Sequence, residues 1–218
     1  MKYTIYLLRH GQTWFNKYNR MQGWSDTPLT PDGRHVAELA AQKLKDIPFA
    51  EAFSSDARRA VDTCKIITDA NINKNKLNNY KITEFREQFY GSFEGIFSGE
   101  AWYNVLWPHG YKTFNSAVPA IGLDKCKDYM KEADPFHDAE NAQEYWERID
   151  RGFAKLTKVV HGGDNVLLVS HGTTIRSIAG RFGEGFHVEK SPANSSLTKV
   201  VVTDGKPVVT EYAKKIVD

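Results

Sequence analysis

The chain has 218 residues, of which 41% are hydrophobic and 26% are charged, and its formal net charge is +2. This composition is that of an ordinary globular protein, and the length is sufficient for one domain with a sizeable core. The small net charge gives no electrostatic reason to expect a nucleic-acid or membrane partner. No apolar run approaches the roughly 20 residues that span a bilayer, and no signal peptide is recognisable. Because Cys64 and Cys126 have no metal-binding or redox spacing, we expect reduced thiols and a cytoplasmic protein.

The chain up to about residue 85 alternates strand and helix patterns. Thr30 and Pro31 are typical of an N-cap and a first helical residue, and Pro48 is expected to lie beyond the end of that helix. Apolar residues, Leu39 among them, recur between these points at helical spacing. The predicted elements are a strand over residues 3–9, this helix, a strand over 50–54, a helix over 56–70 and a third strand over 81–85.

The rest of the chain predicts three more helical regions and three strands. Asp204-Gly205, between two runs rich in β-branched residues, is a hairpin signal. The predicted elements are helices at about 99–106 and 118–131, a helix over 141–160, a strand over 165–170, a helix through Ile175 and Ile178, and strands over 197–203 and 207–212. This order predicts an α/β protein with three layers, in which helices cover both faces of a mostly parallel sheet with an antiparallel edge.

Residues 96–140 interrupt this alternation, because they contain no clear strand and many aromatic side chains. One interpretation is an inserted helical subdomain with a small core of its own. The other is a lid whose aromatic residues shape a substrate pocket. The two interpretations are compatible, and we treat residues 1–218 as one domain with a helical insertion at about 96–140.

Two of the predicted strands end in a histidine followed by a glycine. Arg9-His10-Gly11 ends the first strand, and His171-Gly172 follows the strand over 165–170. Open α/β sheets bind ligands outside the carboxyl ends of their parallel strands. Two imidazoles and a guanidinium at one sheet edge would form a cationic and nucleophilic pocket suited to a phosphoryl group.

Five segments in this order resemble the histidine phosphatase superfamily, which includes the cofactor-dependent phosphoglycerate mutases. The resemblance covers nearly the whole chain and implies an α/β fold with catalysis that needs no metal. One departure is Asp56, where family members often carry proline; we expect it to cap the next helix. The segments are Arg9-His10-Gly11-Gln12-Thr13 with Asn16, residues 22–30, Ser54-Ser55 with Arg59-Ala60 and Thr63, Glu87 with Tyr90-Gly91 and Phe93-Glu94-Gly95, and Ser170-His171-Gly172.

The resemblance and the chemistry of the residues assign a role to each position. A neutral imidazole is able to attack phosphorus, so His10 is expected to form a phosphohistidine intermediate. Arg9, Arg59 and His171 are expected to donate to the phosphoryl oxygens and stabilise the transition state. Glu87 is expected to act as general acid and then as general base. The expected substrate-binding groups are the side-chain amides of Asn16 and Gln22 and the backbone N–H groups of Gly172 and Thr173.

For two of these roles the sequence offers more than one candidate residue. Arg58 and Arg59 point roughly 100° apart on a helix, so only one of them is able to face the site, and the family spacing favours Arg59. Glu84 and Glu94 compete with Glu87 for the acid role. We interpret Glu84 as a surface charge at a strand end and Glu94 as a residue next to the site.

Three classes of function follow, and phosphomonoester hydrolysis is favoured. The mutases carry adjacent arginines in the inserted region, whereas residues 96–140 here contain four lysines and no arginine. A mutase would need 2,3-bisphosphoglycerate as cofactor, while a phosphatase would need none. A non-catalytic phospholigand-binding protein is disfavoured, because every catalytic position holds a competent residue. The expected partner is a small-molecule phosphomonoester; its identity, and the choice between monomer and homodimer, stay open.

Overall fold

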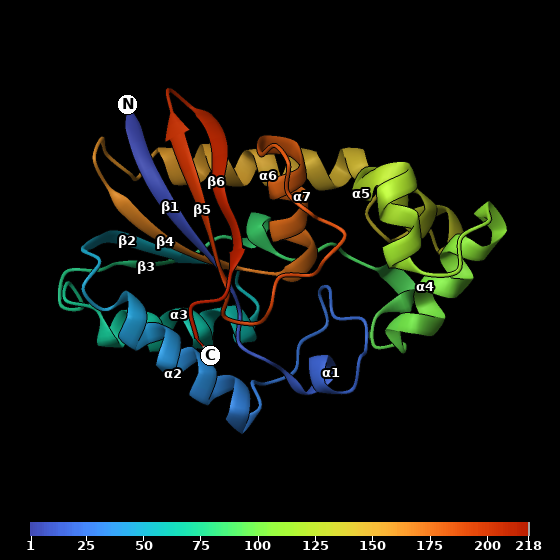
Figure 1. Ribbon diagram of the computed structural model, residues 1–218, viewed down its shortest axis with the longest axis horizontal. Coiled ribbons are helices and arrows are strands. Elements are labelled where there is room, and N and C mark those ends of the chain that lie inside the picture. The colour runs from blue at the N-terminus through green and yellow to red at the C-terminus, as the bar shows by residue number, and fades with distance from the viewer. Residues whose placement is uncertain (218) are drawn as a thin grey trace.

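A six-stranded sheet forms the centre of the protein in a computed structural model that describes residues 1–217, so position 218 of the predicted domain lies outside the described residues. The strand order is β3-β2-β4-β1-β5-β6 (Figure 1). The pairings from β3 to β1 are parallel, and β5 and β6 are antiparallel. The predicted mostly parallel sheet with an antiparallel edge is therefore confirmed. The strands are β1 (Lys2–Arg9), β2 (Phe49–Ser54), β3 (Asn79–Lys81), β4 (Asn165–Ser170), β5 (Leu197–Thr203) and β6 (Lys206–Lys214).

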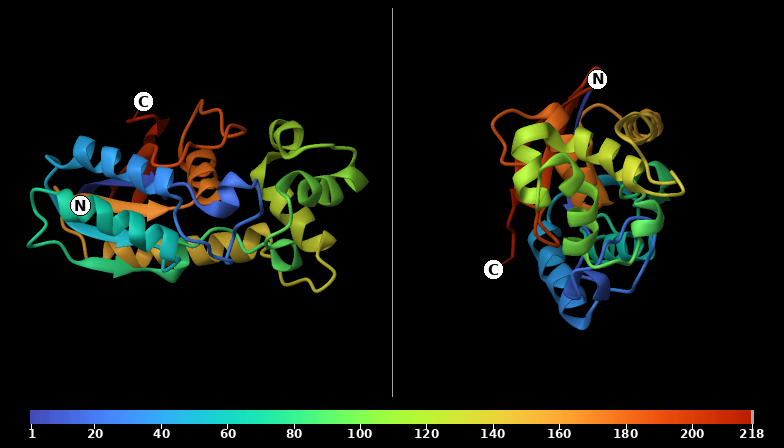
Figure 2. Two further views of the ribbon diagram at one scale, coloured as in Figure 1. Left: turned by 90° about the horizontal axis from the view of Figure 1, so that it is seen from below. Right: turned by 90° about the vertical axis from the view of Figure 1, so that its right-hand side faces the viewer.

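Helices lie on both faces of the sheet. Figure 1 shows α2 and α3 below it and α6 and α7 above it, while α4 and α5 extend beyond one end, as Figure 2 also shows. The α-helices are α1 (Trp14–Lys17), α2 (Pro31–Leu44), α3 (Arg58–Ala70), α4 (Ser98–Leu106), α5 (Phe114–Ala133), α6 (Ala142–Thr157) and α7 (Gly172–Phe182). Short 3-10 helices are η1 (Thr83–Phe85), η2 (Gly91–Phe93) and η3 (Trp107–His109). No helix of the described residues is long and apolar enough to cross a membrane.

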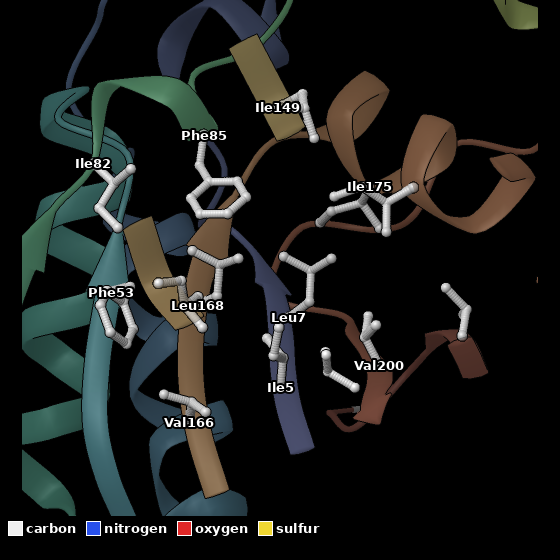
Figure 3. Close-up of a cluster of buried hydrophobic side chains, with 14 of the residues drawn as sticks. Ile5, Leu7, Phe53, Ile82, Phe85, Ile149, Val166, Leu168, Ile175 and Val200 are labelled. Atoms are coloured by element: carbon white, nitrogen blue, oxygen red, sulfur yellow. The ribbon is translucent and has the colours of Figure 1, made fainter. Parts of the chain in front are cut away.

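Side chains alternate between the two faces of the sheet along each strand, so the protein has an apolar core on each face. Ile5 and Leu7 of β1 pack beneath α6 and α7, in the cluster that Figure 3 shows. Leu8, which points to the opposite face, packs with residues of α2 and α3. Because both faces are covered, the central strands are almost continuously apolar, which is why they are recognisable in the sequence.

One prediction about this part of the chain was wrong. The predicted third strand over 81–85 is a short β3 that ends at Lys81, followed by the 3-10 helix η1. The buried residues Ile82 and Phe85 are three positions apart, which is the repeat of a 3-10 turn rather than of a strand. Leu39 is 39% exposed, because it lies outside the stripe of α2 that faces the sheet.

The segment between η2 and α6 has an apolar cluster of its own. Val105 and Leu106 of α4 pack with Cys126 and Met130 of α5. The second helix is longer than predicted, and Gly122, with φ of 78°, places a kink inside it. Both cysteines of the chain are buried and free.

The N-terminus of α2 packs directly against the turn that follows β1. Thr30 caps α2 by accepting from Gly33 N–H, and Thr30 N–H donates to Gln12 O at 2.9 Å. A Cβ atom on Gly33 would overlap the backbone oxygen of Gln12. The absence of a side chain at Gly33 is therefore required for this contact.

Gly33→Ala is expected to lower the free energy of unfolding by about 1–3 kcal/mol, because it overpacks this contact. Urea denaturation of the two proteins measures the difference. Gly162→Ala is the matched control, since a Cβ there would meet its nearest atom, Met1 Cγ, at 3.8 Å. Equal stability of Gly33→Ala and the wild type would show that the turn moves without cost.

Candidate active site

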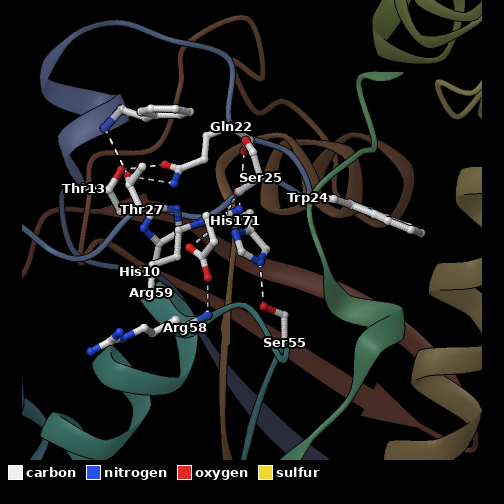
Figure 4. Close-up of polar contacts among 12 residues, drawn as sticks. His10, Thr13, Gln22, Trp24, Ser25, Thr27, Ser55, Arg58, Arg59 and His171 are labelled. Carbon is white, nitrogen blue, oxygen red and sulfur yellow. Dashed lines mark hydrogen bonds and ion pairs between the residues drawn. The ribbon is translucent and has the colours of Figure 1, made fainter. Parts of the chain in front are cut away.

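The carboxyl ends of β1 and β4 bring the two His-Gly pairs together. Arg9 is paired with Ser170 in the sheet register, and His10 N–H donates to Ser170 O at 3.0 Å. The ring centroids of His10 and His171 are 5.2 Å apart, and Figure 4 shows the two rings side by side. The structure thus places both imidazoles at one sheet edge, as the strand pattern predicts.

His10 is held as a neutral ring with one nitrogen available. Its Nδ1 lies 2.7 Å from Gly11 O, and because a carbonyl only accepts, Nδ1 carries the hydrogen. Burial, together with the charges of Arg59 and Arg9, holds the pKa of His10 well below its usual value of about 6.5. The lone pair is therefore on Nε2, which is the atom required of a nucleophile.

His171 is held in the same neutral tautomer by a different contact. Its Nε2 lies 2.7 Å from Ser55 Oγ (Figure 4). Burial, Arg59 and His10 hold the pKa of His171 well below 6.5, so the ring is neutral. When the Ser55 hydroxyl donates to Nε2, the hydrogen of the ring is on Nδ1. This buried Nδ1 has no hydrogen-bond partner among the described residues.

Arg59 is fully buried in the first turn of α3, whereas Arg58 is exposed, in agreement with the helical spacing. The terminal nitrogens of Arg59 are fixed to the loop of residues 22–26: Nη1 donates to Ser25 O and Asp26 Oδ1, and Nη2 to Gly23 O. These bonds leave only its Nε without a partner.

Arg9, like Arg59, has a terminal nitrogen bound to a backbone oxygen. Its Nη1 donates to Pro192 O at 2.6 Å, and its buried Nε has no partner within residues 1–217. Arg9 Nε, Arg59 Nε and His171 Nδ1 are thus three buried donors near His10 that residues 1–217 do not satisfy. Buried donors rarely lack a partner, so these atoms fit an anionic group with several acceptor oxygens.

Glu87 lies at the N-terminus of α7. Its Oε1 accepts from Gln88 N–H and from the N–H and hydroxyl of Thr174. Its Oε2 accepts only from Thr173 N–H, at 2.7 Å, and so retains a lone pair for a proton. The expectation that Thr173 N–H faces a bound anion is therefore wrong, because this donor is used by Glu87. Gly172 and the Thr173 side chain do line the cavity described below.

The two amide side chains are partly committed to protein contacts. Asn16 Oδ1 accepts from Asn194 Nδ2, which also donates to His10 O, so the Asn16 amide nitrogen is left to donate. Gln22 Oε1 accepts from Thr13, and its Nε2 donates one hydrogen to Thr27 (Figure 4). Both amides line the cavity.

The other acidic candidates have different partners. Glu94 accepts from the backbone N–H groups of Gly23, Trp24 and Ser25, and so holds the loop that binds Arg59. Glu84 is largely buried and pairs with Lys155 at 2.5 Å, so its interpretation as a surface charge was wrong.

Asp56 does not cap α3, contrary to expectation. The N-cap is Ala57, without a side-chain hydrogen bond. The Asp56 carboxylate instead forms two hydrogen bonds with Arg86, which lower its pKa. The negative charge of Asp56 is therefore paired with Arg86.

A cavity of about 290 Å³, here called the catalytic cavity, opens over His10, Arg9 and Glu87. Arg59 and His171 are not among the residues that line it. Sequence reasoning missed several residues that line it: Gln12, Arg20, Tyr90, Arg176, Ser191 and Asn194. Arg176 had a signal, since it lies four positions after Gly172 on one helix face. No sequence signal marked Asn194, because only the tertiary fold brings its loop to the site.

Comparisons with known proteins agree with this geometry. Residues 5–215 match the family described as Histidine phosphatase superfamily (branch 1). A 2,3-bisphosphoglycerate-dependent phosphoglycerate mutase from Rhizobium etli is 32% identical over 80% of this chain and 78% of its own. The crystal structure of a phosphoglycerate mutase from Bacillus anthracis has a TM-score of 0.90 and 31% identity, covering 98% of this chain and 93% of its own. A mycobacterial glucosyl-3-phosphoglycerate phosphatase shares the fold, with a TM-score of 0.71 and 24% identity over 99% of this chain and 100% of its own.

Both buried histidines are expected to remain neutral at pH 6, with the hydrogen of His10 on Nδ1, because their pKa values are lowered. Long-range ¹H–¹⁵N correlation spectra of the rings measure charge and tautomer. The shifts of a protonated ring at pH 6 at either position would contradict the burial argument.

The same shifts predict how stability depends on pH. The unfolded chain binds protons at these two rings below about pH 6.5, where the folded protein does not. Their contribution to the free energy of unfolding therefore falls as the pH falls through that value. Urea unfolding at pH 7.5 and pH 5.5 measures the fall, which His171→Asn should make smaller; an equal fall in both proteins would argue against a lowered pKa at His171.

Proposed function

The chain belongs to the histidine phosphatase superfamily of phosphoryl-transferring enzymes, and we propose that it hydrolyses small phosphomonoesters through a phosphohistidine on His10, without a metal ion. The observation that carries this proposal is the set of three buried donors around the His10 ring. A phosphoryl group has three non-bridging oxygens that are able to accept from Arg9 Nε, Arg59 Nε and His171 Nδ1. The neutral Nε2 of His10 then faces phosphorus.

In the first step His10 Nε2 attacks phosphorus, and the bond from phosphorus to the leaving oxygen breaks. The charge on the phosphoryl oxygens is stabilised by the guanidinium groups of Arg9 and Arg59, which are already in place and need no reorganisation. Glu87 protonates the leaving alkoxide from Oε2, the oxygen that accepts a single hydrogen bond.

In the second step a water molecule attacks the phosphohistidine. The Glu87 carboxylate takes a proton from this water, the phosphorus–nitrogen bond breaks, and phosphate leaves. His10 returns to its neutral state, with its Nδ1 hydrogen still directed at Gly11 O. Glu87 is protonated again, so the cycle closes without a cofactor.

Phosphoglycerate mutation is the second candidate, with 2,3-bisphosphoglycerate as cofactor. The names of relatives favour it, as do Arg20 and Arg176, which line the catalytic cavity and are suited to a second anionic group. The lysines of residues 96–140 favour hydrolysis, because none of them lines the catalytic cavity. Of these lysines, Lys125 lies over Tyr129, Lys127 pairs with Asp124 and Lys131 pairs with Glu144.

Release of phosphate from an aryl phosphate and from 3-phosphoglycerate, assayed in the presence of chelator, tests the proposal. We expect release by the wild type and a loss of several orders of magnitude in His10→Ala, because the nucleophile is removed. His161→Ala, at an exposed histidine, is the control and should retain activity. Substantial release by His10→Ala, or a reversible loss on chelation, would contradict the mechanism.

The 3-phosphoglycerate reaction is also followed for isomerisation, with and without 2,3-bisphosphoglycerate. Hydrolysis predicts phosphate release without isomerisation. Bisphosphoglycerate-dependent isomerisation with little release would establish the mutase instead. Both candidates require His10, so the His10→Ala variant does not distinguish them. The isomerisation assay does.

Glu87→Gln is expected to slow alkyl phosphates by roughly 100-fold or more, because these leaving groups need a proton. Activated aryl phosphates should be slowed much less. The ratio of kcat/KM for the two substrate types is the measurement, with Glu38→Gln, a surface change on α2, as the control. Equal losses on both substrate types would show that Glu87 only positions the substrate.

A further inference from the structure

A second cavity, of about 330 Å³, adjoins the catalytic cavity on the side of α4 and α5. We call it the outer chamber. Six residues line both cavities, so the two cavities are adjacent. The residues that line both are Asn19, Ser98, Trp102, Phe114, Arg176 and Ser191.

Arg176 stands at the boundary between the two spaces and is only 5% exposed. Its Nε and Nη2 donate to the backbone oxygens of Val188 and Glu189. No carboxylate of the described residues lies within ion-pair distance of it, and its Nη1 makes no hydrogen bond to them. A buried guanidinium without a counter-charge is costly, so this boundary fits a ligand that carries an acceptor or a negative charge.

The wall of the outer chamber is aromatic. The rings of Trp102 and Phe114 have centroids 4.1 Å apart, and the Arg176 guanidinium lies 4.7 Å from the centre of the Phe114 ring. Such a surface suits a flat or ring-shaped group. Thr113 and Asn115 add polar atoms further out.

Lys112 is exposed and lines the outer chamber but not the catalytic cavity, and we call this unshared part of the chamber its far end. It forms no ion pair with a carboxylate of residues 1–217. Arg176 therefore lies where the two cavities adjoin, and Lys112 lies in the far end of the outer chamber.

We propose that the outer chamber binds the alcohol part of the substrate, and that this substrate is an extended phosphomonoester in which a ring separates the phosphoryl group from a second anionic group. The proposal rests on phosphomonoester hydrolysis at His10. The ring lies on Trp102 and Phe114, and the distal anion is held by Lys112. The combined space is in the range that buries ligands well above the size of a triose.

Three synthetic probes test the outer chamber: phenyl phosphate, biphenyl-4-yl phosphate and 4′-carboxybiphenyl-4-yl phosphate. The last two differ only in a distal carboxylate, so the ratio of their kcat/KM values reports on the far end. We expect a ratio of roughly fivefold in the wild type. Lys112→Gln should reduce it to about one, whereas Lys125→Gln, at a lysine outside both cavities, should keep the wild-type ratio.

Phe114→Leu tests the aromatic wall. It should lower kcat/KM for both biphenyl probes by roughly tenfold relative to phenyl phosphate. A thermal melt checks that this half-buried substitution leaves the protein folded. If it unfolds the chain, the exposed Lys112→Gln variant still decides the proposal.

The outcomes separate this proposal from the one on which it rests. Absence of His10-dependent hydrolysis of phenyl phosphate would overturn the phosphatase proposal. Normal hydrolysis of phenyl phosphate, with a carboxylate ratio of one that Lys112→Gln does not change, would overturn the outer chamber alone. Calorimetric titration of the two biphenyl probes into His10→Ala protein tests the same ratio without turnover, and equal affinities there would also overturn it.

Discussion

The parallel pairing of β1 with β4 is the constraint on which the rest of the site depends. The register that sets Arg9 beside Ser170 makes His10 and His171 the first residues beyond the sheet on neighbouring strands. Because α7 begins directly after β4, its free N–H groups point to the same place, and they hold the Glu87 carboxylate there. A shift of one residue in this register would turn one imidazole to the opposite face of the sheet.

The second feature of the site is a concentration of buried positive charge without equal negative charge. Burial, together with the charges of Arg59 and Arg9, lowers the pKa of both histidines, which keeps the His10 ring neutral. Arg59 is held mainly by loop carbonyls, and the loop is in turn held by Glu94. Asp26 pairs with Nη1 of Arg59 at 2.9 Å, whereas the buried Nε of Arg59 has no partner among residues 1–217 and so is free to donate.

In the proposed function, the groups that transfer the phosphoryl group and the groups that select the substrate come from different parts of the fold. The groups that would carry out phosphoryl transfer come from the ends of β1 and β4, from α3 and, for Glu87, from the loop between η1 and η2. The aromatic wall of Trp102 and Phe114 comes from helices that have an apolar cluster of their own. If the outer chamber binds the alcohol part of the substrate as we propose, changes in this wall would alter which alcohol is bound without moving His10.

The sequence by itself determined the sheet, most helices and the pairing of His10 with His171, because these depend on local periodicity and on where apolar strands end. Helical geometry also separated Arg59 from Arg58. Tertiary structure alone decided the partners of the polar groups. Asp56 meets Arg86 rather than capping α3. Thr173 N–H meets Glu87, 86 positions away in the chain. Such pairings join distant segments and leave no periodic trace in the sequence, so they follow only from the packed fold.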